Sequence, residues 1–95
     1  MLDSTTKKKL LARMGRIEGQ LAAIRRMIDD DTYCVDVLLQ MSAAQGALGK
    51  AGHVLLGHHI EHCVSDACRH GDEAERRRKV QELMDVFARY GGLKR

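Results

Sequence analysis

Apolar residues recur along the first third of the chain with the spacing of an α-helix. They are separated by alternating steps of four and three residues and comprise Leu10, Met14, Ile17, Leu21, Ile24 and Ile28. Such steps keep side chains on one helix face. Ser4, Thr5 or Thr6 can cap the start of this helix, and the acidic cluster at residues 29–31, followed by Thr32, is typical of a turn that leads into the next helix.

The same spacing continues in a second predicted helix, from about Tyr33 to the neighbourhood of Cys63. The residues of this helix that share one face at the same spacing, called the seam below, are Cys34, Leu38, Met41, Gln45, Leu48, Gly52, Leu55 and His59. Glycines within this helix each weaken it by up to about 1 kcal/mol, so packing against other helices must sustain it.

A third helix is predicted over residues 73–90, with an apolar side formed by Val80, Leu83, Met84 and Phe87. The preceding stretch DACRHGD, residues 66–72, is expected to be a connection, and Gly91-Gly92 to end the helix. No internal repeat or second domain is evident, so residues 1–95 are predicted to form a single domain.

Composition supports an all-α fold, because the chain has no proline and only 3% aromatic residues. A domain of 95 residues buries little surface alone, which favours oligomers. The net charge of +3 permits nucleic-acid binding without establishing it. No apolar run approaches the roughly 20 residues of a membrane span, so we expect a cytoplasmic protein without a membrane partner.

Candidate metal ligands gather in the stretch GHHIEHC, residues 57–63. At about 100° per residue, His59 and Cys63 both return to within about 20° of the helix face that carries Cys34. His62 and His58 fall about 80° and 120° away from that face. We therefore predict Cys34, His59 and Cys63 as ligands.

One chain cannot bring these three residues to one ion. Cys34 and His59 lie roughly 37 Å apart along a straight helix, whereas ligands lie about 2.0–2.3 Å from a metal. If two copies pack antiparallel, Cys34 of one chain lies beside the partner's His59 and the partner's Cys63, and the twofold axis creates two identical sites.

Two thiolates and one imidazole, with no fourth protein ligand evident, favour Cu(I) over Zn(II). A cysteine or histidine alone on an apolar seam is more often a packed core residue, and that interpretation stays open for each of the three. We assign the remaining candidates to solvated helix and loop positions: His53, His58, His62, Cys68 and His70.

The run RIEGQLAAIRRMIDDDTYCVDVLLQMSAAQGALGKAG, followed by HHIEHC, resembles the CsoR/RcnR family of bacterial metal- and stress-sensing transcriptional repressors. The resemblance covers nearly the whole chain. It implies a three-helix protomer, an antiparallel four-helix dimer core, a homotetramer, and binding to operator DNA.

In the copper-sensing branch of that family, the ligands are a cysteine and then a histidine and a cysteine one turn apart, which match Cys34, His59 and Cys63. The resemblance implies that Cu(I) releases the repressor from DNA and derepresses copper-resistance genes. The Tyr and Glu that support the ligands in that branch match Tyr33 and Glu82.

Other branches of the family sense Ni(II) or Co(II), with an added N-terminal histidine, or reactive sulfur, with two cysteines and no histidine ligand. Leu2 and Asp3 occupy the N-terminal region here, and His59 is present. These departures favour copper and leave a Ni(II), Co(II) or reactive-sulfur sensor as the alternative.

Basic residues on the first two helices suit a DNA duplex. Arg13 and Lys50 match the DNA-contact positions of the family, and Lys8, Lys9 and Arg16 are further candidates. For any one of these charges, an ordinary solvated helix face is the simpler interpretation.

Two other classes of function are disfavoured. A thiol enzyme would need an oxyanion loop or an orienting third residue, and neither is evident. A purely structural bundle would not explain why Cys34, His59 and Cys63, called the ligand stripe below, share one helix face.

Overall fold

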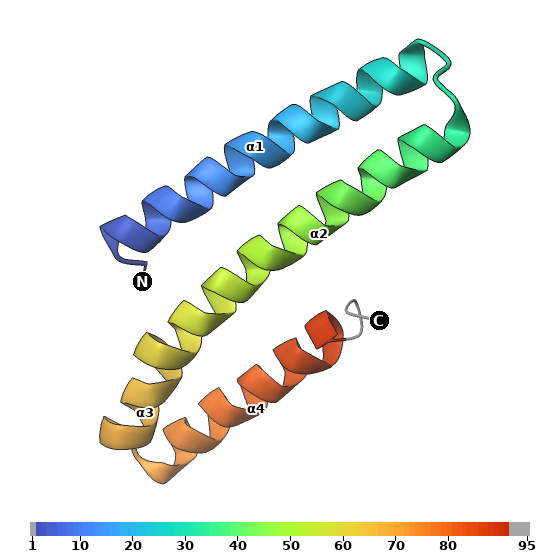
Figure 1. Cartoon of the computed structure of the whole chain (residues 1–95). Helices are drawn as coiled ribbons and strands as arrows, with labels where there is room; N and C mark the ends of the chain where they lie inside the picture. The colour runs from blue at the N-terminus through green and yellow to red at the C-terminus, as the bar shows by residue number, and fades with distance from the viewer. Residues whose placement is uncertain (1, 92–95) are drawn as a thin grey trace. The chain divides into compact units, whose positions relative to one another are not determined.

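The computed structural model describes residues 2–91, with the backbone alone for residues 63–65, 67, 68, 90 and 91. Three long helices confirm the prediction of an all-α, three-helix protomer: α1 (Ser4–Asp29), α2 (Cys34–His59) and α4 (Glu73–Gly91). A π-helical turn, η1 (Ile60–Val64), and a short helix, α3 (Ser65–His70), lie between α2 and α4 (Figure 1). No strand occurs within residues 2–91.

Helix α1 begins one residue earlier than the predicted caps allow. Asp3 is the N-cap, and its Oδ1 accepts a hydrogen bond from the Thr6 backbone N–H at 2.8 Å. A carboxylate at this position satisfies one of the free N–H groups of the first turn and interacts favourably with the helix dipole. Ser4 is therefore the first helical residue rather than a cap.

The turn after α1 forms where the acidic cluster predicts it. The Asp30 N–H donates to the Arg26 carbonyl at 2.9 Å, and the Thr32 N–H donates to the Met27 carbonyl at 2.9 Å. Asp31 adopts a φ of 56°, in the left-handed region that aspartate tolerates better than most residues. These bonds end α1 and reverse the chain into α2.

The predicted connection at residues 66–72 is wrong in its first part, because Ser65–His70 is helical. Ala67 and Arg69 are good helix formers, and Gly71 is the residue of this stretch with the lowest helix propensity. The break is confined to Gly71 and Asp72. Asp72 Oδ1 then accepts a hydrogen bond from the Glu75 N–H at 2.8 Å and caps α4.

The chain divides into two compact units, Met1–Gly57 and His58–Arg95. In the first unit, α1 and the part of α2 up to Gly57 run antiparallel, side by side (Figure 1). Ile24, Val37 and Ala44 form the buried cluster between them, and Met27 packs against it. Two alanines on α2, Ala44 and Ala51, are among the buried residues, and their small side chains permit close approach of α1.

The face of α2 that packs against α1 is not the predicted seam. Val37, Ala44 and Ala51 are buried, and each stands one residue before a seam position, which is about 100° around the helix. The seam itself is uncovered in the single chain, since Leu38 is 61% exposed and Leu48 is 52% exposed. An apolar stripe of this kind on one helix marks a surface that another helix can cover.

In the second unit, α4 contacts both η1 and α3. Large apolar side chains on α4 stay exposed, among them Val80, Met84 and Phe87. Within residues 2–91, no helix combines the length and the hydropathy that crossing a membrane requires.

Candidate metal centre and nucleic-acid interface

Cys34 is the first residue of α2, and its thiol is free and exposed. The preceding residue, Tyr33, holds the first turn of the helix through its carbonyl, which accepts from the N–H groups of Asp36 and Val37 at 3.0 and 3.2 Å. The Tyr33 ring is exposed. The Cys34 sulfur, a candidate soft ligand, is thus presented at a helix end whose backbone is fixed by local hydrogen bonds.

His59 is the last residue of α2 and lies near a carboxylate of α4. Its Nε2 is 3.6 Å from Oε1 of Glu82, and the two side chains are 34% and 55% exposed. This distance is too long for a hydrogen bond, so the contact is an ion pair only when the imidazole is protonated. The structure therefore brings together His59 and Glu82, two residues of the second unit that the sequence singles out.

Cys63 follows His59 by four residues and lies in η1. The side chain of Cys63 lies outside the described residues. The π-helical turn that carries it is a local departure from α-helical geometry, and such turns occur frequently at functional sites.

Within the described part of a single chain, no group of three or more His, Cys, Asp or Glu side chains could hold a metal ion. Cys34 and His59 are the first and last residues of α2. The ligand set Cys34, His59 and Cys63 thus stays a prediction that requires a second chain.

The assignment of His58 to a solvated position is wrong. His58 is buried, with 9% of its surface exposed, and its ring lies against that of His62, with centroids 4.4 Å apart and planes inclined by 35°. A periodicity counted from Cys34 places His58 away from the seam, but it does not show what packs against that other side. His53, His62 and His70 are exposed as expected, while the side chain of Cys68 lies outside the described residues.

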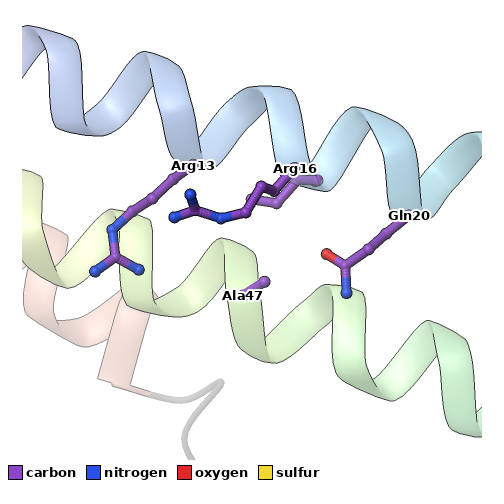
Figure 2. A pocket seen from close by; sticks show the side chains of 5 residues that line it. Arg13, Arg16, Gln20 and Ala47 are labelled. Atoms are coloured by element: carbon purple, nitrogen blue, oxygen red, sulfur yellow. The ribbon is translucent and has the colours of Figure 1, made fainter.

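A groove between α1 and α2 is lined by three polar side chains from one face of α1. It has a volume of about 350 Å³ and is lined by Arg13, Arg16, Ile17, Gln20 and Ala47. Arg13, Arg16 and Gln20 extend from α1 toward α2, with Ala47 on the opposite side (Figure 2). Guanidinium and amide groups of this kind bind phosphate oxygens and base edges.

The other predicted DNA contacts are accessible but do not line this groove. Lys8 and Lys9 are exposed on the first turns of α1, and Lys50 is exposed on α2. Gln20 lines the groove but is not among the predicted contacts, because it is uncharged and the prediction rests on charge. Its position four residues after Arg16 and seven after Arg13 would have placed it on the same face.

The family described as metal-sensitive transcriptional repressor matches residues 6–89 of the chain. The chain belongs to this family of metal-sensitive transcriptional repressors. The expectation of a regulator rather than an enzyme is thereby confirmed, and DNA is the macromolecule on which a transcriptional repressor acts.

Similar proteins include the copper-sensing transcriptional repressor CsoR of Bacillus subtilis strain 168, which is 41% identical over 88 residues, covering 93% of this chain and 84% of that protein. The copper-sensing repressor CsoR with Cu(I) from Geobacillus thermodenitrificans NG80-2 matches with a TM-score of 0.86 and 36% identity, covering 96% and 92% of the two chains. The nickel-responsive transcriptional regulator InrS matches with a TM-score of 0.73 and 29% identity, covering 87% and 90%.

Proposed function

We propose that this protein is a Cu(I)-responsive repressor that binds operator DNA in its metal-free form and leaves DNA when Cu(I) binds. The ligands are Cys34 of one chain with the partner's His59 and the partner's Cys63, and the genes released from repression are copper-resistance genes. The observation that carries this proposal is the uncovered stripe of α2, which holds an exposed thiol at its first residue and a partly exposed imidazole at its last.

An antiparallel α2 helix of a second chain, packed on this stripe, would have two effects. It would cover exposed apolar side chains such as Leu38 and Leu48, and it would set the start of one α2 beside the end of the other. Burial of apolar area stabilises association by about 25 cal/mol per Å² before the costs of ordering. A homodimer, assembled further into a homotetramer, is therefore part of the proposal.

The donor set fits Cu(I). The exposed Cys34 thiol and the His59 imidazole are ligands that this soft ion accepts, and a second thiol follows at Cys63 in sequence. Two similar proteins carry copper in their names, the Bacillus subtilis repressor and the Geobacillus thermodenitrificans repressor with Cu(I).

Glu82 is the residue through which we expect the site to influence α4. A ligating histidine commonly donates its second ring N–H to a carboxylate, which fixes the ring orientation. With Glu82 Oε1 already 3.6 Å from His59 Nε2, a small approach would make that hydrogen bond. Tyr33, next to Cys34, is the corresponding candidate at the other end of α2. Metal occupancy would then bias the position of α4 and, through it, the affinity for DNA.

DNA binding is assigned to the groove residues Arg13, Arg16 and Gln20, together with Lys8, Lys9 and Lys50. Phosphate neutralisation by the basic members gives affinity that falls steeply with salt, while Gln20 offers an amide to a base edge. Lys8, Lys9, Arg16 and Lys50 are exposed, while the half-buried Arg13 and Gln20 line the groove, and this accessibility supports the assignment.

The test is an anaerobic titration of the reduced protein with Cu(I) against a competing chelator, with X-ray absorption on the loaded sample and fluorescence anisotropy of operator DNA recorded in parallel. One Cu(I) per chain in a shell of two sulfurs and one nitrogen, with DNA released at the same stoichiometry, is the expected result. Linkage requires operator DNA to weaken Cu(I) binding by the same factor. Tight Cu(I) binding that leaves DNA affinity unchanged would contradict the proposal.

Single substitutions, tested in the same assay, show which cysteines bind Cu(I). Cys34→Ala and Cys63→Ala should bind DNA and lose copper-induced release, whereas Cys68→Ala, the matched control, should respond normally. Glu82→Gln should keep the Cu(I) stoichiometry and lose most of the release, because it removes the carboxylate near His59 and none of the ligands. A normal copper response in Cys34→Ala would exclude the assigned site.

The similarity to InrS keeps a Ni(II) or Co(II) sensor as the second candidate, beside a reactive-sulfur sensor. The same variants discriminate among these classes. Ni(II) prefers square-planar or higher coordination and gives visible absorption bands, whereas Cu(I) is colourless. DNA release by Ni(II) or by persulfide at lower concentration than by Cu(I) would favour the alternative.

A further inference from the structure

His58 and His62 form a pair of imidazole rings that the proposed copper site does not use. They are four residues apart across the junction of α2 and η1, and their ring centroids are separated by 4.4 Å. His58 is buried and His62 is exposed. One ring is thus held by its surroundings, and the other stands at the protein surface.

This arrangement has the spacing of a two-histidine chelate. Histidines four residues apart on a helix provide two of the ligands in H-x-x-x-H zinc sites. With metal–nitrogen bonds of about 2.1 Å, two imidazoles on neighbouring positions of one ion have centroids roughly 4–5 Å apart. The observed centroid separation of 4.4 Å lies in that range, and the site requires the two rings to turn so that one nitrogen of each faces the same ion.

Burial of His58 restricts its side chain to few conformations. Once its ring has turned to face the ion, such a side chain loses less conformational freedom than an exposed one. The pair also lies at the start of a π-helical turn, a local feature that is frequent at functional sites.

We propose that His58 and His62 form a second metal site, which takes a divalent ion such as Ni(II) or Zn(II) and leaves the remaining coordination positions to water. Imidazole suits these ions, whereas Cu(I) favours thiolate. Within the described residues no third Cys, His, Asp or Glu side chain joins the pair, so the site should be weaker than a closed three-ligand site. The exposed ring of His62 is the side from which water can reach the ion.

Removing the thiols separates this site from the proposed copper site. Ni(II) is titrated calorimetrically into the full chain with Cys34, Cys63 and Cys68 all changed to serine, after circular dichroism has shown that it keeps its helicity. We expect Ni(II) to bind, and His62→Gln to weaken its binding at least tenfold. His62 is exposed, so this change leaves the fold intact. His53→Gln, the matched control on α2, should bind Ni(II) unchanged.

A second measurement locates the ion directly. Paramagnetic Ni(II) should broaden the ring resonances of His58 and His62 before those of His53 and His70. Binding that is unaffected by His62→Gln, or that is lost only with His59→Gln, would overturn the proposal, the second outcome placing the ion at His59 and Glu82. Because this experiment contains no thiol ligand, its outcome is independent of whether Cu(I) is the inducer.

Discussion

At the scale of single residues, Arg13, Arg16 and Gln20 line the groove to which we assign DNA binding. Spacings of three and four residues put them on one face of α1, where they line a groove against Ala47 of α2 (Figure 2). Two of them are cations and the third is a neutral amide. Net charge indicates the two arginines but not the glutamine, although an amide hydrogen-bonds base edges as specifically as a guanidinium does.

Arg16→Ala should weaken operator binding and lower the slope of log affinity against log salt concentration by about 1, because one phosphate contact is lost. Fluorescence anisotropy at several salt concentrations measures both quantities. Arg25→Ala removes the same charge from an exposed position of α1 that does not line the groove, and it should change the slope less. Equal effects of the two substitutions would show that only the net charge of α1 matters.

At the scale of elements, two helices begin where a side chain accepts a hydrogen bond from a backbone N–H group of the first turn. Asp3 caps α1 and Asp72 caps α4, each through an Oδ1 that accepts a backbone N–H three residues later at 2.8 Å. Seam periodicity predicts the existence of each long helix but not these boundaries. Periodicity does not predict the short helix α3 either, because six residues are too few to show a period.

Asp72→Ala should lower the free energy of unfolding by about 0.5–2 kcal/mol, because the first turn of α4 loses its side-chain acceptor. Asp72→Asn keeps an acceptor oxygen and should retain most of that stability. Urea denaturation followed by far-UV circular dichroism measures both variants. Protein concentration must be the same in both experiments because assembly contributes to stability. If Asn proves as destabilising as Ala, the cap is not the source of the effect.

At the scale of the whole molecule, the single chain leaves apolar surface on α2 and α4 exposed. The small core between α1 and α2 uses one face of α2, so the face that carries Cys34 is available to another chain. Small domains commonly gain the missing burial by association. Assembly and metal binding are thus expected to depend on the same surface.

Leu48→Glu should shift the protein toward monomers and weaken Cu(I) binding, because it places a charge in the middle of the proposed interface, where Leu48 is 52% exposed in the single chain. Analytical ultracentrifugation measures the first effect and chelator competition the second. Ala43→Glu adds the same charge on an exposed position of α2, about 140° away around the helix, and should leave assembly unchanged. A Leu48→Glu protein that assembles normally would place the interface elsewhere.

The sequence by itself determined the helical class and the three long helices, because these follow from local periodicity. The ligand set Cys34, His59 and Cys63 stays a prediction from spacing and residue chemistry. Family resemblance, rather than spacing, singled out Glu82 as a residue that supports the ligands, and the structure places its Oε1 3.6 Å from His59 Nε2. Only the tertiary structure decided which face of α2 packs on α1, that His58 is buried against His62, and that Gln20 joins two arginines in a groove. Periodicity shows which residues share a face, while contact between faces depends on how closely two helices approach. On α2 the buried face carries the small side chains of Ala44 and Ala51.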